Sequence, residues 1–429
     1  MTMRLNPPSD SMKNAAKPAL SRLFSFIGPG LVVAAAGIGA GDVITATVTG
    51  ARFGTTLLWA IVLTAVLKFL INENLTRWQL ATGTTLIAGW IERLPRIVPI
   101  YFGFYLLLWT FLVGGSLSNA CALAGHSLFP GLPVAAWGAI HSLAAVALVW
   151  WGRFDYFQTL MKTLVGLMAI IVVVCAGLLW PGWSAVLSGV FVPTLPAGGG
   201  RAVLGVFGGI GGSVTLMCYG YWIRENGWRG NEQLKKTWGD LGLAYTLTAL
   251  FGISLSIIAS NCSPDITQGT RMALDLAAQL EIILGPAGRW AMLLGFWCCT
   301  FTAMLGVWQG VPYLFDDFVA SWKNRDRAAS SQAMAGGDRQ SPVYRAALLY
   351  LAIPPLTLLY FRQPVLVVVA FTIAGAFVMP FLAGTLLYMN NRRDWVGEQR
   401  NPWWLNAGLV IALGVFGYVC YAEVSSVLK

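Results

Sequence analysis

Two glycine-rich breaks lie inside long apolar stretches, at matching places in the two halves of the chain. The first is Gly37–Val43, in a stretch that starts near residue 26, and the second is Gly208–Val214, in one that starts near residue 202. Glycine in a helix costs roughly 1 kcal/mol against alanine, and aspartate at bilayer depth, as at Asp42, costs about 2.5–3.5 kcal/mol. Interrupted helices at corresponding positions of two halves indicate a binding site near the middle of the membrane.

Composition places the chain among membrane proteins. Hydrophobic residues make up 57% of it and charged residues 11%, whereas a soluble domain carries about 25% charged residues. Apolar runs repeatedly reach the length of about 20 residues that spans a bilayer. Because no extended polar/apolar alternation occurs, a β-barrel is not expected. We predict an all-α polytopic membrane protein.

Hydropathy predicts eleven spans. They lie at about 26–50, 55–80, 99–125, 131–151, 156–180, 202–225, 238–260, 288–318, 343–361, 364–390 and 403–425. Residues 1–20 are expected to be a mobile cytoplasmic tail, residues 21–390 the core, and residues 391–429 an additional eleventh helix.

The distribution of Lys and Arg predicts the orientation. With a cytoplasmic amino terminus, 20 of the 28 basic residues fall in inside loops and six in outside loops, while Lys68 and Lys162 lie within spans. This bias favours an inside amino terminus and an outside carboxyl terminus. The net charge of +10 then reflects topology, and its expected partner is anionic lipid rather than nucleic acid.

The two halves are predicted to form an inverted repeat. Five spans precede the second break, and an odd number forces the second half to insert upside down. Spans 1–5 (about 26–180) and 6–10 (202–390) are the repeats, and the breaks fall in the first span of each.

The breaks supply the candidate substrate-binding residues, because glycine leaves main-chain groups open to a ligand. Asp42 is the carboxylate that would bind a cation or an ammonium group; it could also cap the second half-helix. Met217 and Cys218 could supply soft metal ligands. The glycines could instead serve close helix packing, and the aromatic residues could fill the core. The candidate set is Gly37, Gly39, Gly41, Asp42, Thr45, Gly209, Gly211, Gly212, Thr215 and Tyr219.

Five further residues are candidates for coupling or gating. Lys68 lies deep in span 2 and must be paired or reach water, and Glu73 is one turn from Arg77, so the two are expected to pair. His141 could relay protons or be a hydrogen-bonded core residue. Arg224 and Glu225 close span 6 on the inside, as a gate or as a surface pair.

Three motifs resemble the Nramp family of divalent-metal transporters. They are Gly28–Gly30 before the first break, Arg52–Trp59 entering span 2 and Ala81–Leu86 closing it. The resemblance runs over most of the chain. It implies the LeuT-like fold with eleven spans and broken helices 1 and 6, together with proton-coupled symport.

The metal-binding motifs of that family are not matched. Where the family has Asp-Pro-Gly-Asn in span 1, this chain has Gly39–Asp42, so the acid stands at the asparagine position. Where span 6 of the family has Met-Pro-His-Asn, this chain has Thr215–Cys218, and the stretch Gly114–Asn119 of span 3 carries no acid. We therefore place the chain in a divergent branch, whose proton route is unassigned.

The sequence favours a secondary transporter that works by alternating access in a bacterial inner membrane. No P-loop or catalytic signature is present, so we expect neither an ATP-driven pump nor an enzyme, and no cofactor. Paired breaks disfavour a channel or a receptor. One carboxylate is sparse for a divalent ion, whereas glycine N–H groups could receive an organic carboxylate and Asp42 an ammonium group. A small zwitterionic solute such as an amino acid is therefore the favoured cargo, and Gly37–Gly39 also resembles the glycine motif of amino-acid–polyamine–organocation transporters. The alternative is a divalent cation held by Asp42, magnesium or manganese first.

Overall fold

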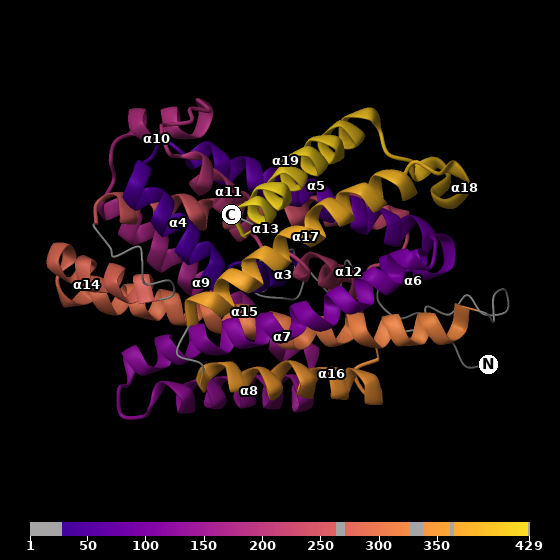
Figure 1. Ribbon diagram of the computed structural model, residues 1–429, viewed down its shortest axis with the longest axis horizontal. Helices are drawn as coiled ribbons and strands as arrows, with labels where there is room; N and C mark the ends of the chain where they lie inside the picture. The colour runs from indigo at the N-terminus through magenta and orange to yellow at the C-terminus, as the bar shows by residue number, and fades with distance from the viewer. Residues whose placement is uncertain (1–27, 263–270, 326–337, 361–363, 428–429) are drawn as a thin grey trace, which may run out of the picture.

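The computed structural model describes residues 28–262, 271–325, 338–360 and 364–427 (Figure 1). Within these ranges the regular structure is helical. The α-helices are α3 Gly30–Gly37, α4 Ala40–Phe53, α5 Leu58–Thr82, α6 Leu86–Arg93, α7 Ile97–Leu128, α8 Val134–Trp151, α9 Phe154–Leu178, α10 Trp183–Phe191, α11 Gly200–Gly209, α12 Thr215–Glu225, α13 Leu234–Ser260, α14 Met272–Leu284, α15 Pro286–Asn324, α16 Pro342–Ala352, α17 Pro364–Met389, α18 Arg393–Val396 and α19 Trp403–Val427. Short 3-10 helices occur at Asn231–Gln233, Pro354–Tyr360 and Gly397–Gln399.

Each predicted span overlaps a helix or a broken pair of helices. Within the described residues, eight helices are long and apolar enough to cross a membrane, or nine when the bent pair α3 and α4 counts as one crossing. The pair α11 and α12 consists of two short helices, and part of α17 lies among side chains that are not described. The helical membrane fold is confirmed, and the count of eleven crossings stays a prediction.

Both predicted breaks are present. The axes of α3 and α4 differ by 66° across Ile38 and Gly39. Between α11 and α12, residues 210–214 leave the helical path, and Gly211 and Gly212 have φ of 82° and 70°. Because L side chains rarely adopt such positive φ values, this turn depends on glycine.

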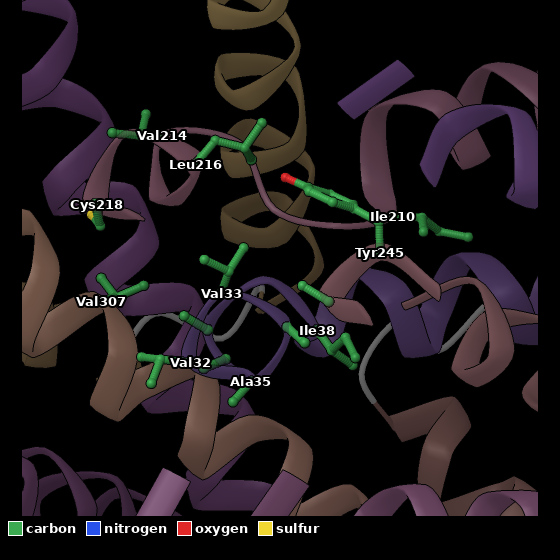
Figure 2. Packing of buried hydrophobic residues seen from close by; sticks show 14 of the residues in the cluster. Val32, Val33, Ala35, Ile38, Ile210, Val214, Leu216, Cys218, Tyr245 and Val307 are labelled. Atoms are coloured by element: carbon green, nitrogen blue, oxygen red, sulfur yellow. The ribbon is translucent and has the colours of Figure 1, made fainter. Parts of the chain in front are cut away.

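The broken helices lie at the centre of the bundle. The half-helix α3 packs against α9, α13 and α15, and α12 packs against α15. In Figure 1, α7 and α15 run across the molecule, with α8 and α16 on one side and α17 and α19 on the other. Figure 2 shows apolar side chains that close around the breaks, among them Ile38 and Ile210. The breaks are therefore enclosed by packed helices.

The last helix, α19, is tied to the core by buried asparagines. It packs against α17 and α5. The Asn74 side-chain oxygen on α5 accepts hydrogen bonds from Asn401 at 2.6 Å and from Asn390 at 3.2 Å. These contacts join the segment between α17 and α19 to the middle of the bundle.

Candidate functional site

The first break is capped by its own acid. Gly39 is the N-cap residue of α4, and Asp42 stands three residues later. The main-chain N–H of Gly39 donates to Asp42 Oδ2 at 2.9 Å. A carboxylate in the first turn also suits the positive end of the helix dipole. Asp42 therefore caps α4 from its first turn, while Gly39, rather than Asp42 as the capping interpretation had it, is the N-cap residue.

The same carboxylate also binds the second break. The main-chain N–H of Gly211 donates to Asp42 Oδ1 at 2.8 Å. Since Asp42 is 2% exposed, these bonds form away from bulk water. One side chain thus satisfies main-chain donors from both breaks, a role that capping alone does not require.

Lys68 on α5 binds the second break from another direction. Its ammonium donates to the main-chain carbonyl of Gly212 at 2.6 Å and to that of Ile210. Lys68 is completely buried, and a buried cation must be compensated by such acceptors. The pairing that the sequence requires for Lys68 is therefore made with the turn between α11 and α12.

The glycines allow the two breaks to touch. A Cβ atom on Gly212 would lie 3.1 Å from Gly37 Cα, and one on Gly41 would lie 3.3 Å from the Gly209 carbonyl oxygen. A Cβ on Gly209 would lie only 2.3 Å from Thr45 Oγ1. A larger residue at Gly41 or Gly209 would crowd the contact between α4 and α11, and one at Gly212 would crowd α3. The close-packing interpretation of the glycines therefore also describes this structure.

A small cavity lies where the breaks meet. Its volume is about 60 Å³, room for a few water-sized groups. Besides apolar residues from α3, α7, α15 and α17, its lining includes Gly37, Gly39, Gly41, Asp42, Trp109, Ser116, Gly208, Gly209, Gly212, Ser213 and Thr215. The Thr215 hydroxyl is buried there, with no hydrogen-bond partner in the described part of the chain. The cavity therefore offers an unused oxygen near Asp42.

Seven of the ten candidate binding residues line this cavity, and three do not. Gly211 does not line the cavity, and its main-chain N–H donates to Asp42. Thr45 lines a separate, wider groove between α4 and α11. Tyr219 is fully buried, and its hydroxyl donates to Asp240 at 2.9 Å. Tyr219 is therefore bound to Asp240 outside the cavity lining.

The coupling and gating candidates lie outside the cavity lining. Glu73 pairs with Arg77 at 2.5 Å, as the sequence predicts. The two ring nitrogens of His141 face the Trp137 carbonyl oxygen at 2.7 Å and the Trp297 indole nitrogen at 2.9 Å. Such a fully bonded ring corresponds to the core interpretation of that histidine.

Arg224 and Glu225, at the end of α12, contact aromatic side chains. The Arg224 guanidinium lies 5.9 Å from the centre of the Tyr221 ring. Glu225 accepts a hydrogen bond from the Tyr313 hydroxyl at 2.5 Å. These contacts join the end of α12 to α15.

Sequence reasoning missed a buried carboxylate at the start of α3. Asp240 on α13 accepts a hydrogen bond from the main-chain N–H of Gly30 at 2.6 Å, besides the one from Tyr219. The signal was an acid inside the predicted seventh span. Ser116 and Ser213, which line the cavity, were also missed because serine carries no distinctive signal in an apolar helix.

Soft metal ligands are not gathered in the site. Met217 and Cys218 are buried on α12, but neither lines the cavity. Across the described ranges, no group of three or more His, Cys, Asp or Glu side chains could hold a metal ion. The side-chain acceptors that line the cavity are oxygens, which suit hard cations better than soft ones.

An all-helical membrane protein whose two broken helices meet around a central cavity has the LeuT-like fold. Solved structures share this fold. The Eremococcus coleocola manganese transporter, solved with an aromatic bis-isothiourea substituted compound, has a TM-score of 0.73 at 15% identity, over 98% of this chain and 89% of that one. MhsT in complex with L-phenylalanine has a TM-score of 0.61 at 14% identity, over 92% and 98% of the two chains.

The chain belongs to the Nramp family. The family profile described as "Natural resistance-associated macrophage protein-like" matches residues 30–426, which confirms the membership that the sequence motifs predict. The protein is thus a membrane transporter of a known family.

Curated relatives carry a common name. The "Divalent metal cation transporter MntH" of Brucella suis is 26% identical over 71% of this chain and 70% of its own length. The protein of the same name from Staphylococcus saprophyticus is 29% identical over 40% of this chain and 39% of its own length. With that second relative and several others, the match spans less than half of the relative.

Proposed function

We propose that this Nramp-family protein is a secondary transporter of a hard divalent cation, with magnesium and manganese the first candidates. The observation that carries the proposal is the small cavity between the breaks. It is lined by Asp42, by Ser116 and Ser213, and by Thr215, whose hydroxyl has no hydrogen-bond partner among the described residues. Carboxylate, carbonyl and hydroxyl oxygens together with retained water are the ligands of such ions. The name shared by the curated relatives supports the same cargo class.

This cargo replaces the amino acid that the sequence favoured. That expectation needed glycine N–H groups to receive a substrate carboxylate. The N–H groups of Gly39 and Gly211 already donate to Asp42. A cavity of about 60 Å³ also has little room for an amino-acid side chain. A partly hydrated ion fits these conditions better.

Transport is proposed to proceed by alternating access around the two breaks. The repeats at about 26–180 and 202–390 would move against each other, with residues 391–429 as an added helix. We propose proton coupling and a cytoplasmic amino terminus in a bacterial inner membrane. The family membership and the 20-to-6 bias of basic residues support these points.

Uptake into proteoliposomes tests the cargo. Mn²⁺ and Mg²⁺ uptake is measured with and without an inward proton gradient, beside a panel of amino acids. We expect cation uptake that Asp42→Asn lowers by about tenfold or more, since the only carboxylate of the cavity lining is lost. The matched control is Asp155→Asn on the surface of α9, where the side chain is 84% exposed. Cation uptake equal in both variants would remove Asp42 from the site.

A small zwitterionic organic solute is the second candidate, favoured by one observation. The groove between α4 and α11 has a volume of about 680 Å³ and is lined by Arg52 and Arg201 and by no acid. Two guanidinium groups attract a carboxylate and repel a cation. Amino-acid uptake without cation uptake in the same assay would establish this candidate instead.

A further inference from the structure

Three consecutive residues of the second break are bound by two opposite charges. The carbonyl oxygens of Ile210 and Gly212 accept from the Lys68 ammonium, and the N–H of Gly211 between them donates to Asp42. This segment follows α11 and precedes α12, so these groups are released from the helical hydrogen-bond ladder. The turn is therefore held from two sides: the Asp42 carboxylate binds its N–H group, and the Lys68 ammonium binds its two carbonyl oxygens.

The carbonyl oxygens of Ile210 and Gly212 form a natural cation site. Main-chain carbonyls freed at a broken helix, near the negative end of the half-helix dipole, coordinate monovalent cations. Here an ammonium on a flexible side chain occupies that position. Gly211 allows the turn through its φ of 82°, and its Cα lies against the Lys68 side chain, since a Cβ atom there would be in van der Waals contact with Lys68 Cδ at 3.4 Å. Lys68 therefore takes the place that a free cation could take.

We infer that Lys68 is a built-in cation of the second break, which occupies the Ile210 and Gly212 carbonyls in place of a free monovalent ion and competes with the cargo. The second half of this inference rests on the proposed cation transport. Both charges belong to the protein, so Asp42 is compensated when no cargo is bound. A divalent ion arriving beside Asp42 meets the charge of Lys68 as well.

This arrangement limits how tightly a cation is held. Two like charges a few ångströms apart in a buried site repel strongly, because the effective dielectric constant is far below that of water. Lys68 therefore lowers cargo affinity and favours release. It also leaves the empty carrier without an uncompensated buried carboxylate, which would otherwise oppose its return across the membrane.

Purified protein in detergent tests the inference through two readouts. The variants are Lys68→Met, which removes the charge, and Lys68→Gln, which removes the charge but keeps an amide N–H donor group. The control is Lys323→Met, which removes a charge at an exposed position near the end of α15. The first readout is thermal stability in Na⁺, K⁺ or choline at fixed ionic strength. The second is Mn²⁺ affinity by calorimetry.

We expect saturable stabilisation by Na⁺ or K⁺ in both Lys68 variants, and none in the wild type or in Lys323→Met. Lys68→Met should bind Mn²⁺ about tenfold more tightly than the wild type, since the repelling charge is gone. Lys68 variants that fold without any monovalent-ion effect would overturn the inference. So would variants that fail to fold in every cation tested, because no free ion would then replace the lysine.

The same data separate this inference from the proposed function. If the wild type binds no Mn²⁺ but Lys68→Met gains saturable Na⁺ or K⁺ stabilisation, the divalent cargo is wrong and the built-in cation stands. If the wild type binds Mn²⁺ and Lys68→Met binds it equally well with no monovalent effect, the cargo stands and the role of Lys68 falls.

Discussion

Asp42 on α4 accepts a hydrogen bond at 2.8 Å from the main-chain N–H of Gly211, a residue 169 positions away in the other break. Its second oxygen accepts from Gly39 at 2.9 Å. A single buried carboxylate thus connects the two interrupted helices. Any motion that separates the breaks must break or exchange one of these two bonds.

Asp42→Asn is expected to destabilise the protein as well as to affect transport. The amide keeps one acceptor oxygen, so one of the two main-chain N–H groups is left buried without a partner. Such a loss costs about 1–3 kcal/mol in the free energy of unfolding. Thermal unfolding in detergent measures it, with Asp155→Asn as the exposed control. A variant as stable as the control would show that the two bonds contribute nothing to the fold.

Gly212→Ala tests the conformation of the second break. Gly212 has φ of 70°, and an added Cβ would lie 2.5 Å from Thr215 Oγ1. Backbone strain and this close contact should lower the free energy of unfolding by about 1–3 kcal/mol. Gly242→Ala on α13, where a Cβ meets nothing within 4 Å, should be neutral or stabilising by about 0.5–1 kcal/mol. Equal stability of the two variants would argue against a tight turn at Gly212.

Asp240→Asn should loosen the half-helix α3. The carboxylate accepts from the Gly30 N–H and from the Tyr219 hydroxyl, and weakening both contacts lowers the local opening free energy by about 1–3 kcal/mol. Hydrogen–deuterium exchange over Gly30–Gly37 should be faster. Tyr219→Phe, which leaves the bond to Gly30 in place, should have the smaller effect. Unchanged exchange in Asp240→Asn would mean that the hydrogen bond from Gly30 does not hold α3.

His141→Ala should alter stability and leave the pH dependence of uptake as it is in the wild type. Its removal leaves the Trp297 indole N–H, now 2.9 Å from His141 Nε2, without this acceptor, at a cost of about 1–3 kcal/mol. The comparison is His126→Ala, in the last turn of α7, which should cost less. A shifted pH profile in a variant of normal stability would instead support the proton-relay interpretation.

Asn74→Ala should release the last helix. It removes the side-chain oxygen that accepts from Asn390 and Asn401. Both amides keep one other acceptor, the Asn74 carbonyl and the Asn406 side chain, so the expected cost in the free energy of unfolding is about 1 kcal/mol. Exchange in the segment between α17 and α19 should rise, and Asn324→Ala at the exposed end of α15 should leave it unchanged. Faster exchange in both variants would point to general instability.

Features that depend on neighbours along the chain could be predicted from the sequence. The span positions follow from the length of the apolar runs, and both breaks follow from glycine clusters. The cap made by Asp42 on Gly39 and the pairing of Glu73 with Arg77 are contacts within one turn. The Nramp motifs gave the family and its fold, which the family profile confirms.

Contacts between distant segments were decided by the tertiary structure. The sequence shows that Lys68 needs a partner, but only the packing of α5 beside the second break identifies the carbonyls of Ile210 and Gly212. Likewise, helical spacing placed Tyr219 near the site, whereas its hydroxyl binds Asp240 on α13.

There is a physical reason why some features could be predicted from the sequence and others only from the tertiary structure. Hydrophobic length and glycine content set where helices run and stop, because these costs are local to each segment. A buried charge, by contrast, is compensated by whichever main-chain or side-chain group the fold brings within hydrogen-bond distance. Sequence alone therefore determined a glycine-broken, polytopic helical transporter, while the tertiary structure decided how Asp42 and Lys68 divide the donors and acceptors of the second break between them.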